Sequence, residues 1–232
     1  MVNISTIHSM AIVCNKERVL MVGTDGSLYR FTGLRKHSNS GTDHLCWDVL
    51  QIATNSDVIT HGAHLAKSVF THTAMVSQAG VLYTYGDGRH GQLGQDEDDF
   101  DAKYYPRALS RNVFGGQKVC GVSCGRNFTV AVTGVGEVFT FGHNDVGQLG
   151  IGTNTPGDCQ KIQNPRRVET LIGKCIVMVA SGCQHTVCVC AKGKVFSWGK
   201  NSFGQLGLGN CEDVNSHTPM EVLRFGTHDK KA

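Results

Sequence analysis

Three short motifs carry residues that could do chemistry, and each fits a different reaction or ligand. Residues 86–91 read Gly-Asp-Gly-Arg-His-Gly and match G-x-G-x-x-G, the phosphate-binding turn of dinucleotide-binding domains. Residues 121–125 read Gly-Val-Ser-Cys-Gly and match G-x-S-x-G, the turn that presents a hydrolase nucleophile. Side-chain types that bind zinc fall close together at four positions: Cys183, His185, Cys188 and Cys190.

The surroundings of each motif favour a structural role. A dinucleotide-binding turn opens a helix, whereas residues 91–94 continue as Gly-Gln-Leu-Gly, and no helical pattern follows Ser123 either. The positions one repeat before the zinc candidates hold no metal-binding set: Arg126, Phe128, Ala131 and Thr133. We therefore expect no metal, no cofactor and no catalytic residue, and we interpret the chain as a non-enzyme.

The tetrapeptide Gly-Gln-Leu-Gly recurs three times, at residues 91–94, 147–150 and 204–207. The spacings of 56 and 57 residues are too regular for chance and indicate a structural repeat. We expect the glycines to form close turns, the Gln amide to satisfy loop backbone and the Leu to fill the gap between sheets. The expected structural residues are Gly86, Gly91, Gln92, Leu93, Gly94, Gly142, Gly147, Gln148, Leu149, Gly150, Gly199, Gly204, Gln205, Leu206, Gly207, His72 and His185.

Two strands are expected before each tetrapeptide. One strand alternates with an aromatic face, and an earlier one is rich in β-branched residues. The segments in question are 81–85, 137–141 and 194–198, preceded by 73–76, 129–132 and 186–189. A short connection containing Gly makes each pair an antiparallel hairpin. His72 and His185 stand at the entrance of the earlier strand, where we expect them to bond to backbone of the adjacent loop.

A weaker copy of the unit opens the chain. Residues 18–22 and 26–31 align without a gap 54 residues ahead of the next copy; an alternative register places residues 8–13 in the earlier strand, with an insertion after it. We divide one propeller-type domain into a degenerate repeat and three others: 1–79, 80–135, 136–192 and a partial 193–232.

Composition limits the classes of partner. A formal net charge of +3 is too small for nucleic-acid binding by charge alone, and no stretch has the ~18 apolar residues of a membrane span. The first thirty residues lack a signal-peptide pattern, so we expect a cytoplasmic or nuclear protein in which the ten cysteines are reduced.

At these residues the sequence resembles the regulator of chromosome condensation family. The third copy is similar to the family repeat from Gly182-Cys-Gln-His-Thr through Trp198-Gly199 to Gly207. The resemblance covers 63–225 well and 1–62 loosely, and it implies an all-β fold, a β-propeller of four-stranded antiparallel blades. About three and a half blades are present, so the propeller is partial or atypically closed. We expect a part of a longer protein; pairing with another copy or an unusual closure are the alternatives.

For function, the resemblance implies a protein-binding scaffold, with a guanine nucleotide exchange factor for a Ran-like small GTPase as the alternative. The resemblance also implies that several important acidic and His side chains of the family's founding member lie just before the His-Thr element. The matching positions here hold none of these types: Phe70, Thr71, Arg126, Asn127, Cys183 and Gln184. This disfavours exchange. The partner is expected to be a protein, either a small GTPase, a ubiquitin-pathway component or a second copy of the chain.

The longest and most divergent loops are the candidate partner surface. They lie between residues 94 and 106 and between 150 and 165, and residues 96–101 form the strongest charge feature of the chain. A solvated loop is one interpretation of this run, and an acidic handle with an apolar anchor for a basic partner is the other. The candidate partner-binding residues are Asp96, Glu97, Asp98, Asp99, Phe100, Asp101, Arg126, Asn127 and Gln184.

Overall fold

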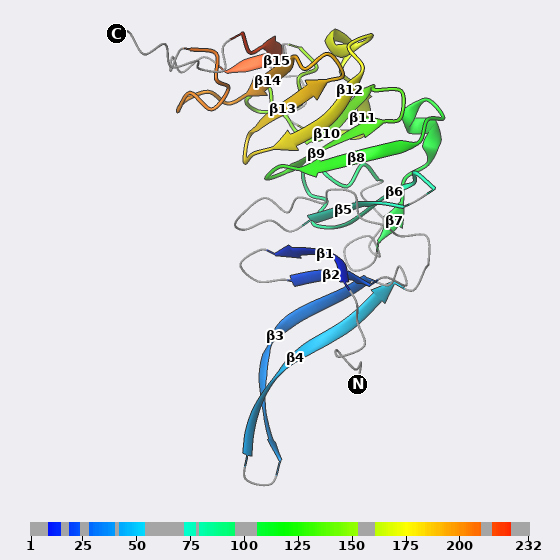
Figure 1. Cartoon of the computed structure of the whole chain (residues 1–232), viewed down its shortest axis with the longest axis vertical. Helices are drawn as coiled ribbons and strands as arrows, with labels where there is room; N and C mark the ends of the chain where they lie inside the picture. The colour runs from blue at the N-terminus through cyan, green and yellow to red at the C-terminus, as the bar shows by residue number, and fades with distance from the viewer. Residues whose placement is uncertain are drawn as a thin grey trace.

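Four antiparallel sheets follow one another in chain order in the computed structural model (Figure 1). The structure describes the strand backbones within residues 9–53, and it describes residues 72–77, 79–95, 106–152, 161–209 and 215–223 in full. Each sheet is a meander in which consecutive strands pair antiparallel. Within the described residues no helix has the length and hydropathy needed to cross a membrane.

The strands group into sheets A to D. Sheet A contains β1 (Ser9–Cys14), β2 (Val19–Gly23), β3 (Leu28–Asn39) and β4 (Thr42–Ala53). Sheet B contains β5 (His72–Val76), β6 (Leu82–Gly86) and β7 (Arg107–Ala108). Sheet C contains β8 (Val119–Cys124), β9 (Phe128–Thr133), β10 (Val138–His143) and β11 (Lys161–Arg167). Sheet D contains β12 (Ile176–Ser181), β13 (His185–Cys190), β14 (Val195–Gly199) and β15 (Ser216–Glu221).

The expected hairpins form the middle pair of strands in sheets A, C and D and the first pair in sheet B. In sheet C, Val138 pairs with Val132 and Phe141 pairs with Thr129 across β9 and β10. The turn between these strands needs a left-handed residue, and Gly136 supplies it with a φ of +81°. Sheets A and D lie at opposite ends of the stack in Figure 1, so these strands form a partial propeller, and the predicted fold class is confirmed.

The degenerate first copy folds in the register without a gap. Strands β2 and β3 pair as a hairpin, and Val19 lies opposite Phe31. The residues of the alternative register lie mostly in β1, which pairs with β2 as the strand before it. Strands β3 and β4 are twelve residues each and extend away from the stack as a long hairpin (Figure 1).

The sequence repeat and the folded sheet are out of phase. The repeat at 80–135 contributes β6 and β7 to sheet B and then β8 and β9 to sheet C. Short 3₁₀ helices, η3 (Arg111–Phe114) and η4 (Glu169–Leu171), precede the first strands of sheets C and D. Each repeat therefore ties two neighbouring sheets together through the covalent chain.

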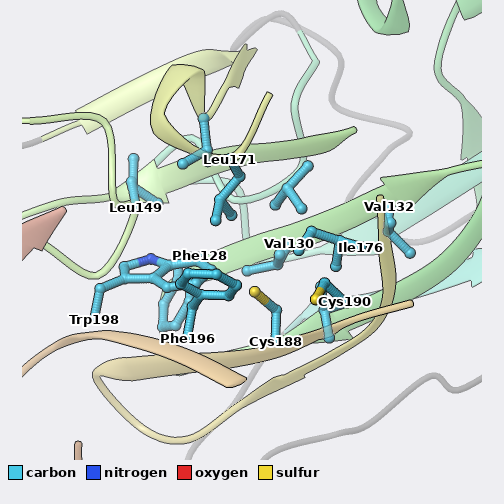
Figure 2. Packing of buried hydrophobic residues seen from close by; sticks show 13 residues of the cluster. Phe128, Val130, Val132, Leu149, Leu171, Ile176, Cys188, Cys190, Phe196 and Trp198 are labelled. Carbon is cyan, nitrogen blue, oxygen red and sulfur yellow. The ribbon is translucent and has the colours of Figure 1, made fainter. Parts of the chain in front are cut away.

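Two apolar clusters lie between neighbouring sheets. One joins sheet B to sheet C and includes Leu82, Ala131 and Phe141. The other joins sheet C to sheet D, and Figure 2 shows Phe196 and Trp198 of β14 beside Phe128 of β9. Burying each large apolar side chain stabilises the fold by about 1.5 to 3 kcal/mol. Because both clusters lie between sheets, the stacking of sheets supplies much of the apolar free energy of folding.

Candidate protein-binding rim

Turns and loops gather at one edge of sheets B, C and D, and we call this edge the loop rim. It comprises the turns at 125–127 and 182–184 and the loops at 87–95, 144–152 and 200–209. Antiparallel strands place the start of β9 beside the end of β10, so turn and loop of one sheet lie together. The opposite edge carries the tight hairpins that begin near residues 77, 134 and 191.

The Gln of each Gly-Gln-Leu-Gly closes its own loop. The side-chain oxygen accepts a backbone N–H two residues earlier in all three copies: His90 to Gln92 at 2.8 Å, Val146 to Gln148 at 3.0 Å and Phe203 to Gln205 at 2.8 Å. The Leu side chains are buried, and each Leu carbonyl accepts a hydroxyl from the neighbouring strand: Thr84, Thr140 and Ser197. Each loop is therefore held by its own Gln side chain and by a hydroxyl group of the neighbouring strand.

The backbone carbonyl of the same Gln binds the next sheet. At the junction of sheets B and C, Thr129 Oγ1 donates to the Gln92 carbonyl at 2.8 Å. Because its one proton is used there, Thr129 accepts from His72 Nε2, which lies 3.0 Å away. Burial lowers the pKa of His72 to about 4, so the ring is neutral. His72 therefore bonds to a side chain of the next sheet, whereas the sequence led us to expect loop backbone.

The junction of sheets C and D repeats this arrangement with different donors. Thr186 Oγ1 donates to the Gln148 carbonyl at 3.1 Å, and Trp198 Nε1 donates to the same oxygen at 2.9 Å. Phe128 stands where His72 stands one sheet earlier and packs in the apolar cluster instead. The Gln carbonyl is thus the common acceptor between sheets, and the residue types around it vary.

The nucleophile-like motif is part of the same packing. Ser123 is buried, and its Oγ accepts the backbone N–H of Ser181 in sheet D at 2.8 Å. A Cβ on Gly125 would overlap the Phe128 ring, and Gly182 is crowded by His185 in the same way. These glycines leave room for the ring that follows each of them. Because Ser123 is buried and its hydroxyl is bonded to sheet D, it is not presented to a substrate.

The potential zinc ligands point in different directions. Cys188 and Cys190 are buried between sheets C and D (Figure 2), whereas Cys183 is exposed at the loop rim. His185 lies on the other face of β13, because successive strand residues alternate. Burial raises the pKa of the Cys188 thiol to about 12, which keeps it protonated. Across the fully described segments, no three His, Cys, Asp or Glu side chains gather at a point.

The candidate partner-binding residues that the structure describes lie on the loop rim. Arg126 is exposed, and Asn127 and Gln184 are partly exposed. The Arg126 N–H donates to the Cys183 carbonyl at 3.0 Å, which joins the two turns. The carbonyls of Asn127 and Gln184 accept from the ends of the adjacent strands. Residues Asp96, Glu97, Asp98, Asp99, Phe100 and Asp101 lie outside the described residues.

The loop rim also holds ionisable groups that the sequence did not single out. The His90 and His143 rings belong to neighbouring sheets and meet edge to face, with centroids 5.0 Å apart. His143 Nδ1 lies 3.1 Å from Asp145 Oδ1, and this hydrogen bond is the main cause that lowers the pKa of Asp145 to about 2. These residues occupy positions that differ between copies, so the repeat pattern gave no signal for them.

Stacked meander sheets with a repeated interlocking loop define a propeller-repeat protein. The family model described as the regulator of chromosome condensation (RCC1) repeat matches residues 79–132, 135–189 and 192–230. These matches span more than half of the sequence, so the chain belongs to the RCC1 repeat family. The suspected resemblance is confirmed.

Curated relatives share the repeats within much longer proteins. The Arabidopsis thaliana ultraviolet-B receptor UVR8 is 35% identical over 159 residues, which are 68% of this chain and 33% of UVR8. The human E3 ubiquitin-protein ligase HERC2 is 35% identical over 152 residues, which are 66% of this chain and 3% of HERC2. The chain thus spans a third or less of either relative.

Solved propellers share the fold. Human WBSCR16 superposes with a TM-score of 0.72 at 23% identity, over 94% of this chain and 54% of that one. Yeast RCC1 (Prp20), in a crystal structure with Kap60, superposes with a TM-score of 0.70 at 18% identity, over 98% of this chain and 51% of that one. The family and the fold together identify a repeat-based interaction domain.

Proposed function

We propose that the chain is a non-catalytic scaffold that binds a protein partner through the loop rim. The observation that carries this proposal is that the recurring residues and the variable residues of the repeat occupy different places in the fold. Residues that recur, such as Gln148 and Leu149, are buried and hold one sheet to the next. Residues at the rim that differ between copies, such as Arg126, are exposed.

The rim has the properties of a binding surface. Its turns are joined by backbone hydrogen bonds and its loops are closed by Gln side chains, so little ordering entropy is lost on association. The Arg126 guanidinium adds five hydrogen-bond donors, and the neighbouring Gln184 amide adds both donors and an acceptor. Recognition by differing side chains on a fixed backbone is typical of repeat proteins.

Two arguments support a scaffold over a nucleotide exchange factor. The turn positions before β9 and β13 carry Arg126, Asn127, Cys183 and Gln184, and none of these is acidic or His. The similar proteins also include a photoreceptor and a ubiquitin ligase, so the repeat alone does not define exchange activity.

Charge reversal on the rim tests the proposal. The full chain, an Arg126→Glu variant and a Lys192→Glu control are used to capture proteins from cell extract, with quantitative mass spectrometry as the readout. Lys192 is also an exposed cation, and it lies in the hairpin at the opposite end of the strands of sheet D. We expect the specific partners to be retained by Lys192→Glu and lost by Arg126→Glu.

Two results would oppose the proposal. If Arg126→Glu captures the same partners as the unmodified chain, the turns of the rim are not the binding surface. If a catalytic amount of the chain accelerates release of a fluorescent nucleotide from a small GTPase, exchange replaces the scaffold role. Reversing the charges of residues 96–101 in the same capture assay tests the acidic loop separately.

A further inference from the structure

Two histidine rings from neighbouring sheets meet on the loop rim, where sheet B joins sheet C. His90 lies in the loop after β6, and His143 is the last residue of β10. Their ring centroids are 5.0 Å apart with an angle of 68° between the ring planes, and both side chains are partly exposed. Small solutes can therefore reach the pair, and imidazole is the commonest metal ligand in proteins.

The separation of the two rings fits one metal ion between them. Zinc binds imidazole nitrogen at about 2.0 to 2.1 Å and prefers tetrahedral angles, so two rings on one ion have centroids about 5 Å apart. The observed separation of 5.0 Å already has this value. Because the rings can turn about their side-chain bonds, they can share an ion without a movement of either sheet.

His143 has the hydrogen bond that prepares a histidine for metal binding. Its Nδ1 lies 3.1 Å from Asp145 Oδ1, to which the Nδ1–H donates. The proton then lies on Nδ1, and Nε2 keeps the lone pair that a metal ion needs. Asp145 is itself held in place, because Gln148 Nε2 donates to the same Oδ1 at 2.8 Å. A carboxylate that orients the ring in this way is the usual partner of a metal-bound histidine.

The loop that carries His90 is fixed to sheet C. Gln163 Nε2, in β11, donates to the Gln95 carbonyl of this loop at 2.8 Å. A Cβ on Gly91 would lie 2.9 Å from the Ile162 carbonyl oxygen, so the loop backbone lies directly against β11. The distance between the two rings is therefore set by the packing of the junction.

Acidic and basic groups balance around the pair. Arg89 forms an ion pair with Asp87 at 2.6 Å. Lys161 is a second cation near the His90 ring, and the Asp145 carboxylate is a second anion. Two carboxylates thus offset two cations, so the local charge does not oppose the binding of a divalent ion.

The repeat itself does not need histidine at either position. At the junction of sheets C and D the equivalent residues are Val146 and Lys200. The Gln148 side chain closes the loop there, and the Gln148 carbonyl binds the next sheet as in the first junction. The histidine pair is therefore an addition that is specific to the junction of sheets B and C.

We propose that His90 and His143 together bind one divalent transition-metal ion of the zinc type, with Asp145 as the positioning residue of His143. The ion links sheet B to sheet C. The chain supplies two ligands, and the remaining coordination positions are open to water or to a side chain of a bound protein. The proposal goes beyond the scaffold role, because the ion binds whether or not the rim holds a protein partner.

A zinc titration of the full chain tests the site, with long-range ¹H–¹⁵N correlation spectra of the histidine rings as the readout. Exposed thiols such as Cys175 and Cys183 are alkylated first, because thiolates also bind zinc. The titration is run at about pH 7.5, where an ordinary imidazole is mostly neutral. We expect ZnCl₂ to shift the His143 Nε2 signal and one nitrogen signal of His90 with the same midpoint.

Substitutions assign the ligands. His90→Gln and His143→Gln should each raise the zinc concentration at the midpoint of the remaining ring by about tenfold or more, because one of two ligands is lost. Asp145→Asn should raise the midpoint by about tenfold and bring the second His143 tautomer into the spectra. Lys161→Gln removes a neighbouring cation that does not bind the ion, and this control should not raise the midpoint.

Three results would overturn the proposal. If zinc leaves both rings unshifted, the ion does not bind there. If the two rings shift with different midpoints, they do not share an ion. If the His143 midpoint is unchanged in the His90→Gln variant, His143 binds zinc without its neighbour. The titration of the unmodified chain remains decisive even where a variant fails to fold.

Discussion

Leu149→Ala tests whether the Gly-Gln-Leu-Gly loop locks one sheet to the next. Leu149 is 0% exposed and lies in the cluster between sheets C and D, beside Phe128 and Trp198 (Figure 2). Its backbone is held independently, because Thr140 donates to its carbonyl and Asn144 accepts its N–H. The substitution should therefore leave the loop in place and a cavity between the sheets.

The expected cost follows from that rigidity. Truncation of a buried Leu to Ala costs about 2 to 5 kcal/mol, with larger values where the surroundings cannot collapse. Two sheets and a hydrogen-bonded loop surround Leu149, so we expect about 3 kcal/mol. For a chain of this size the loss corresponds to a fall in Tm of about 6 to 12 °C.

Urea unfolding followed by circular dichroism measures this loss, with the same m-value for both proteins. Leu223→Ala is the matched control, because Leu223 is 83% exposed and its truncation should change stability by less than about 0.5 kcal/mol. If Leu149→Ala costs less than about 1 kcal/mol, or no more than Leu223→Ala, the loop does not lock the sheets and the packing argument is wrong.

Three further substitutions probe single contacts. The pKa of the buried His72 ring is lowered to about 4, so between pH 6.5 and pH 4 the unfolded chain binds a proton that the folded chain does not. The wild-type chain therefore loses stability as the pH falls through this range. In His72→Phe, the free energy of unfolding measured in urea should depend less on pH over the same range. Gly136→Ala should lower the Tm more than Gly193→Ala, since both share the backbone cost of about 1 to 2 kcal/mol but only Gly136 faces a neighbouring sheet. Trp198→Phe should cost about 1 kcal/mol in the same unfolding assay, because it removes one of two donors to the Gln148 carbonyl.

The sequence predicted the parts of the fold that side-chain types determine. Alternation around Phe139 and Phe196 marked strands, and Gly136 and Gly193 marked the hairpin turns between them. The ungapped register of the first copy followed from residues 18–22. These features are local, and each depends on a residue type that few others could replace.

The contacts between sheets could not be predicted in the same way. The acceptor at each junction is the carbonyl of Gln92 or Gln148, and a backbone carbonyl leaves no trace in sequence. The donors to this carbonyl change from Thr129 at one junction to Thr186 and Trp198 at the next, and His72 at the first junction bonds to the Thr129 hydroxyl instead. The offset between repeat and sheet was likewise hidden, because a repeat period fixes the length of a unit and not its boundaries.

Alkylation of individual cysteines by iodoacetamide, with readout by mass spectrometry, tests most directly whether sheets stack face to face. Cys188 and Cys190 are shielded only if sheet C covers sheet D, and burial raises the pKa of Cys188 to about 12. Cys175, just before β12, and Cys183, in the turn between β12 and β13, are exposed and serve as internal references. Stacking predicts rapid labelling of Cys175 and Cys183, with Cys188 and Cys190 labelled only after unfolding. Equal labelling of all four thiols in the native chain would contradict it.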